Sequence, residues 1–136
     1  MQEPLVALLI LAAAAGSFWA WLEWRRRRVR RGRSEDLVRA YDVSGTGVLV
    51  LAFTTPDCMP CKVLQRPALE DLKRRFPGLV VTGEVDALES PELARRFGIL
   101  TVPSTVVIGP AGDIRAVNHG AVTARRLASQ AKLNGA

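Results

Sequence analysis

Both cysteines of this 136-residue chain lie in one short segment, Cys58-Met59-Pro60-Cys61. The segment follows the apolar run 48–54, which has the length of a buried strand, and it precedes apolar residues at helical spacing. At the start of a helix, a two-residue spacer allows the two sulfur atoms to bridge. The unpaired N–H groups there also stabilise a thiolate, and such motifs lower a cysteine pKa from about 8.5 to about 7 or below. The spacing therefore predicts thiol–disulfide exchange, with Cys58 as the more exposed, attacking thiol and Cys61 as the thiol that resolves the mixed disulfide.

The spacer residues support this interpretation of the cysteine pair. Pro60 fits the first turn of a helix, where a missing N–H costs nothing, and Met59 completes the spacer. A zinc site needs four ligands, and beyond the pair the chain offers only His119, so zinc would require a symmetric dimer that donates two cysteines per chain. An inert buried pair is a further alternative, against which the flanking Asp57 and Pro60 argue. We expect no metal and no cofactor.

The rest of the chain predicts alternating helices and strands that position this segment. Helical spacings and apolar runs of strand length predict helices at 34–41, 60–76, 90–98 and 123–133 and strands at 48–54, 79–85, 103–108 and 114–117. Pro67 falls inside the second helix and is expected to kink it. The short turn segment 109–113 predicts a hairpin between the last two strands. We expect an α/β fold in which a parallel sheet, with helices on both faces, carries an antiparallel edge pair.

The charge of the chain is concentrated in one segment. The sequence has 19 Lys and Arg against 13 Asp and Glu, a formal net charge of +6, and seven of the arginines lie in residues 25–33. From Ser34 onward there are 12 basic and 11 acidic residues, a difference of +1. A folded basic surface for nucleic acid is therefore not expected. Two cysteines also exclude a multi-disulfide scaffold, and 49% hydrophobic residues exclude disorder over most of the chain.

The N-terminal segment predicts a membrane anchor. Residues 4–22 carry no charged side chain, and at about 1.5 Å per residue a helix of this length roughly spans a hydrocarbon core of about 30 Å. All three tryptophans, Trp19, Trp21 and Trp24, lie at the C-terminal end of this stretch, as in an interfacial aromatic belt. We expect a single transmembrane anchor at 1–24 that contacts lipid through residues 4–22, an arginine-rich juxtamembrane linker at 25–33 and a folded domain at 34–136.

Three other interpretations of this segment fit its sequence less well. A cleaved signal peptide needs a basic start, which Met1-Gln2-Glu3 does not provide. A buried core helix would not be followed by seven arginines. The arginine run as a nucleic-acid or import signal lacks interleaved aromatic residues. The arginines instead predict, by the positive-inside rule, that the folded domain faces the cytoplasm.

Residues from about 34 to 133 resemble a thioredoxin-like domain. The resemblance rests on several motifs in order: Phe53, Cys58-Met59-Pro60-Cys61-Lys62, Pro67, Val85-Asp86-Ala87, Phe97-Gly98-Ile99, Val102-Pro103-Ser104 and Gly120-Ala121. It implies a thioredoxin-like fold with a central mixed sheet flanked by helices. It also implies that the Val102–Pro103 peptide is cis, faces the dithiol, and binds the extended chain of a substrate through the backbone of Val102. An ordinary proline at the start of a strand is the alternative for Pro103.

The sequence departs from this family at several positions. Met59 stands where the family usually has glycine, and Asp57 replaces an aromatic residue, so a carboxylate lies beside Cys58 in the sequence and opposes its thiolate. The family's buried acid falls at Ala52 and its lysine partner at Thr82, and both are lost together, as the cost of an unpaired buried charge requires. Water, or a carboxylate such as Glu84, would then move protons at the second cysteine.

The resemblance and the anchor together predict a membrane-anchored thiol–disulfide oxidoreductase. We expect a single-pass protein of the plasma or inner membrane with a cytoplasmic domain. Its expected partners are disulfide-containing protein substrates and a dithiol donor such as a thioredoxin-reductase-type system. One alternative reverses the topology and gives an exported domain for oxidative folding or for reductant delivery to exported thiols. Another is a non-catalytic interaction module that binds partners through the Val102–Pro103 face.

Overall fold

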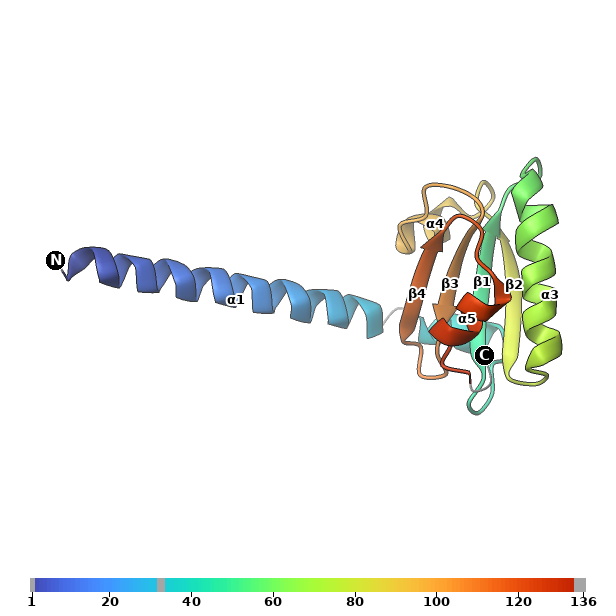
Figure 1. Ribbon diagram of the computed structural model, residues 1–136, viewed down its shortest axis with the longest axis horizontal. Helices are drawn as coiled ribbons and strands as arrows, with labels where there is room; N and C mark the ends of the chain where they lie inside the picture. Colours follow the sequence, from blue (N-terminus) through green and yellow to red (C-terminus); the bar gives the residue numbers. More distant parts are fainter. Residues whose placement is uncertain (1, 32–33, 134–136) are drawn as a thin grey trace.

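A four-stranded sheet with the order β2-β1-β3-β4 forms the centre of the domain in the computed structural model, which describes residues 2–31 and 34–133 (Figure 1). The elements follow one another as α1 (Glu3–Arg31), α2 (Glu35–Ala40), β1 (Val48–Thr54), the π-helical segment η1 (Cys61–Gln65), α3 (Arg66–Arg75), β2 (Val80–Asp86), α4 (Pro91–Arg96), β3 (Ser104–Ile108), β4 (Ile114–His119) and α5 (Ala124–Gln130). This order agrees with the order predicted from the sequence, and the bounds of β1 are the predicted ones.

The sheet is mixed, as the resemblance implied. β1 pairs with β2 in parallel, whereas β1 with β3 and β3 with β4 pair antiparallel. The expectation that only the edge pair would be antiparallel is therefore wrong. The one helix in the connection between β2 and β3 does not run back along the sheet: α4 has six residues and rises about 9 Å, whereas the seven residues of β2 extend over about 23 Å. The chain does not return to the other end of the sheet, so β3 begins near the end of β2.

Side chains from β1 fill both halves of the core. Its residues alternate between the two faces, as the pleat of a strand requires. On one face, Val48, Val50 and Ala52 pack with α3 and α5. On the other face, Leu49, Leu51 and Phe53 pack with α2 and α4. Burial on both faces explains why β1 reads as a continuous apolar run. The central strand is thereby fixed, and its carboxyl end leads into the cysteine segment.

The N-terminal helix α1 is longer than the predicted apolar span and extends away from the sheet in Figure 1. Its backbone continues through most of the predicted linker 25–33, of which Gly32 and Arg33 lie outside the described residues. Within the described chain, Glu3–Arg25 is the one stretch long and apolar enough to cross a membrane, and none of it is buried against the domain. A signal sequence near the N-terminus also meets these criteria of length and apolarity.

Candidate active site

The two cysteines form a disulfide at the junction between β1 and η1. Their Cα atoms are 5.3 Å apart, and the turn between Thr54 and Cys58 carries the chain from the strand to the helix start. Both cysteines are buried, with exposed fractions of 8% for Cys58 and 5% for Cys61. Exposure therefore does little to distinguish Cys58 from Cys61, although the sequence predicts Cys58 to be the more exposed of the two.

Hydrogen bonding distinguishes the two sulfur atoms instead. The backbone N–H of Cys61 donates to Sγ of Cys58 across 3.2 Å. Pro60 adopts helical angles, φ −60° and ψ −29°, and has no N–H, so the N–H of Cys61 is the donor that this turn offers to Cys58. A donor at a helix N-terminus stabilises negative charge. This donor is therefore available to Cys58 Sγ for the stabilisation of negative charge.

The helix that follows the cysteines begins with an irregular turn. The N–H of Arg66 donates to the carbonyl of Cys61, a bond that spans five residues, as in a π-helix. Pro67 is expected from the sequence to kink this helix. In the structure, a π-helical segment precedes α3, and Pro67 lies in the first turn of α3. Three apolar side chains near the disulfide are exposed on this turn and the spacer before it: Met59, Val63 and Leu64.

The Val102–Pro103 peptide is cis, as the resemblance implied. The segment is held by two hydrogen bonds: Oγ of Ser104 donates to the carbonyl of Thr101 across 2.7 Å, and the N–H of Gly120 donates to the carbonyl of Pro103 across 2.8 Å. Val102 is thus fixed at the edge of the sheet where β3 begins and where β4 ends.

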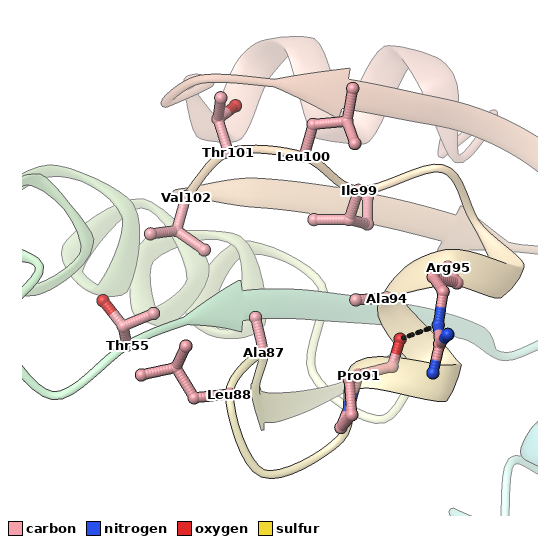
Figure 2. A pocket seen from close by; sticks show the side chains of 10 residues that line it. All are labelled: Thr55, Ala87, Leu88, Pro91, Ala94, Arg95, Ile99, Leu100, Thr101 and Val102. Atoms are coloured by element: carbon pink, nitrogen blue, oxygen red, sulfur yellow. Dashed lines mark hydrogen bonds between the residues drawn. The ribbon is translucent and has the colours of Figure 1, made fainter.

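A pocket of about 400 Å³ lies beside this segment. Figure 2 shows Thr55 and Val102 at one end of the pocket and Arg95 at the other. Thr55 connects the pocket to the disulfide, because its carbonyl accepts the N–H of Cys58 across 3.2 Å. Two leucines at the rim are unusually exposed, Leu88 at 73% and Leu100 at 91%. Sequence reasoning missed both: Leu88 lies in the turn after β2, and Leu100 follows the turn at Phe97-Gly98.

The carboxylate considered as a proton carrier is engaged elsewhere. Oε1 and Oε2 of Glu84 accept hydrogen bonds from Arg66 across 2.8 and 3.1 Å. These bonds hold the pKa of Glu84 below its ordinary value. Ala52 lies opposite Glu84 in the β1–β2 ladder and is buried. The hypothesis that Glu84 moves protons at Cys61 is therefore not supported, because a carboxylate that is paired with Arg66 and has a lowered pKa is both a weak base and a poor proton donor near neutral pH.

Comparison with known proteins shows which family and which solved structures the chain is similar to. A family model described as thioredoxin matches residues 36–133. Chloroplastic thioredoxin M2 of Arabidopsis thaliana is 30% identical over 87 residues, which are 64% of this chain but only 46% of that protein. The thioredoxin of Bacillus subtilis is 30% identical over 77 residues, 53% of this chain and 73% of that protein. The X-ray structure of Fasciola hepatica thioredoxin has the same fold, with a TM-score of 0.57 at 23% identity over 72% of this chain and 88% of that one.

Replacing Glu84 tests its role directly. We expect Glu84→Gln to leave the pH dependence of disulfide reduction unchanged. The variant should lose at most about 1 kcal/mol of stability, because the pair with Arg66 is half exposed and screened by water. Since folding lowers the pKa of Glu84, this stability is present above the pKa of the unfolded carboxyl and is lost as the pH falls through the folded value. Arg66→Gln breaks the same pair and is the matched control. A shifted pH–rate profile in Glu84→Gln alone would show that Glu84 carries protons.

Proposed function

The chain belongs to the thioredoxin family, and from that premise we propose that Cys58 and Cys61 are the redox pair of a thiol–disulfide oxidoreductase that reduces disulfides in protein substrates. The hydrogen bond from the Cys61 N–H to Cys58 Sγ, at 3.2 Å, is the observation that carries the proposal. It supports Cys58 as the thiolate and hence as the nucleophile.

The exchange proceeds in two steps. The Cys58 thiolate attacks one sulfur of a substrate disulfide; a mixed disulfide forms, and the second substrate sulfur leaves as a thiolate that takes up a proton. Cys61 then loses its proton and attacks Cys58 Sγ, which releases the first substrate sulfur as a thiolate that is protonated in turn. Two electrons pass to the substrate, and the oxidised product is the Cys58–Cys61 disulfide present in the structure. A dithiol donor, such as a thioredoxin-reductase-type system, returns the pair to the reduced state.

Substrate binding is assigned to Val102 and Pro103. Within residues 34–133, no hydrogen bond engages the backbone N–H or the carbonyl of Val102, so both groups are free to pair with an extended substrate segment. The pocket beside Val102 is lined mainly by apolar groups, with Leu88 and Leu100 at its rim. This arrangement supports substrates in which a bulky apolar side chain lies close to the reactive cysteine.

We further propose that α1 anchors the protein in a membrane through residues 4–22. Apolar side chains point outward all around this helix, and none of the span is covered by the domain; such a helix is stable only in an apolar environment. At its C-terminal end the ring of Trp21 stacks with Phe18 at 6.1 Å and lies under the Arg25 guanidinium at 5.3 Å. An aromatic and cationic pair of this kind suits the headgroup region. The arginines favour a single-pass plasma or inner membrane protein with a cytoplasmic domain.

Two serine variants separate the roles of the cysteines. Cys58→Ser should abolish reduction of insulin disulfides by the 136-residue chain in detergent, because the nucleophile is lost. Cys61→Ser should stop turnover while Cys58 still attacks, so mixed disulfides with substrates should accumulate and be resolved by added dithiothreitol on a non-reducing gel. Undiminished activity of Cys58→Ser would contradict the proposal, and a failure of Cys61→Ser to capture substrates would favour the non-catalytic interaction module.

A charge at the pocket rim tests the substrate surface. Leu100→Asp should raise the KM for insulin roughly fivefold, because an apolar substrate side chain would lose its contact. It should not affect folding, since Leu100 is almost fully exposed. Leu79→Asp, at an exposed leucine at the opposite end of the sheet, is the control and should leave the KM unchanged. Equal effects of both substitutions would rule out the pocket as the substrate surface.

The orientation of the domain can be tested in intact cells. In a chain with both native cysteines replaced by serine, Glu89→Cys should resist a membrane-impermeant maleimide until the cells are permeabilised. Gln2→Cys, on the other side of the span, should be labelled without permeabilisation. The reverse pattern would place the domain outside, where oxidative folding or reductant delivery to exported thiols becomes the assignment. Recovery of both variants in the soluble fraction would contradict the anchor.

A further inference from the structure

Gln65 ends the π-helical segment that begins at Cys61, and its side chain is 2% exposed. The amide makes a reciprocal pair with the backbone of Val122: Nε2 donates to the Val122 carbonyl across 3.3 Å, and Oε1 accepts the Val122 N–H across 3.0 Å. One glutamine amide thus supplies one donor and one acceptor to a single residue, as a neighbouring strand would. The site mechanism described above makes no use of this contact.

The loop that Gln65 holds is also bound to the substrate-binding segment. Val122 lies two residues after Gly120, whose N–H donates to the carbonyl of Pro103 across 2.8 Å. Gly120 turns the chain at φ +92°, a value that side chains rarely permit. A continuous set of contacts therefore connects the turn that carries Cys61, through Gln65 and Val122, to the residue that follows Val102.

The π-helical turn explains how Gln65 reaches this loop. A turn closed between Cys61 and Arg66 holds one more residue than an α-helical turn. Gln65 is consequently buried, while Val63 and Leu64 on the same turn remain exposed. The irregular turn thus directs a polar side chain, and not an apolar one, into the space between the active-site helix and the loop after β4.

We propose that Gln65 is a positioning residue for substrate binding: by fixing the loop 120–123, it sets the Val102–Pro103 backbone at the correct distance from the dithiol. The inference rests on the proposed function. A protein substrate must contact Cys58 and Val102 at the same time, so it depends on their relative placement. A small disulfide needs to reach only Cys58 and is insensitive to the loop.

The test compares a protein disulfide with a small one in the 136-residue chain in detergent. Gln65→Met keeps a side chain of similar length but removes the donor and the acceptor. The KM for insulin should rise about tenfold, as loss of a buried hydrogen-bonded pair implies. The kcat for insulin, and the rate with 5,5′-dithiobis(2-nitrobenzoate), should remain within about twofold of the wild type.

Gln130→Met is the matched control. Gln130 makes a similar reciprocal amide pair, with the side chain of Asn118, at 2.8 and 2.7 Å between α5 and β4. Its loss should lower the thermal midpoint of unfolding and leave the KM for insulin unchanged. If Gln65 had a purely structural role, both variants would lower the midpoint and neither would separate the two substrates.

A second variant covers the case in which Gln65→Met does not fold. Gln65→Glu keeps an acceptor for the Val122 N–H and loses only the donor, so its KM for insulin should rise in the same direction. An unchanged KM in a folded Gln65→Glu or Gln65→Met chain would overturn the positioning role. A wild-type chain that reduces neither substrate would instead refute the proposed function.

Discussion

The N–H of Cys61 lies 3.2 Å from Cys58 Sγ, in a turn whose two ends are held by the core of the domain. The helix behind this turn packs through Leu69 and Leu72 on the face of β1 that α5 also covers. β1 is buried on both faces, so packing from both sides holds the strand that leads into the cysteine turn. A fixed strand end and a fixed helix start leave the intervening turn little freedom. The turn geometry on which the proposed Cys58 thiolate rests is therefore supported by core packing.

The direction of β3 has an equally direct effect on the site. Because β3 runs antiparallel to β1, Ser104 lies opposite Phe53, and His119 lies opposite Ser104 in turn. The start of β3 and the end of β4 thus meet the carboxyl end of β1 at one edge of the sheet. Had β3 been parallel to β1, as strand alternation alone suggested, Pro103 would lie at the far edge. The family resemblance placed Pro103 correctly, where the general rule for alternating elements did not.

The sequence predicted those features that depend on local patterns. The apolar run of β1 and the cysteine spacing at a helix start are properties of short segments, and so is the turn that closes the β3–β4 hairpin. The features it missed depend on residues far apart in the chain. Gln65 and Val122 are separated by 57 positions, and nothing in the periodicity of the helix marks Gln65. Glu84 looked available for proton transfer because its partner Arg66 comes from a different element, 18 positions earlier.

The two sides of the disulfide differ in a way that suits an extended substrate. On one side, Leu88 and Leu100 form an open apolar rim that adapts to a side chain at little cost in hydrogen bonds. On the other side, the Gln65–Val122 pair closes the space with directed hydrogen bonds, which tolerate little displacement. In the proposed function, a substrate segment along Val102 contacts the rim directly and depends on the buried Gln65–Val122 pair only through the loop 120–123. The rim then contributes the preference among side chains, while the hydrogen-bonded side sets how far the substrate sulfur lies from Cys58.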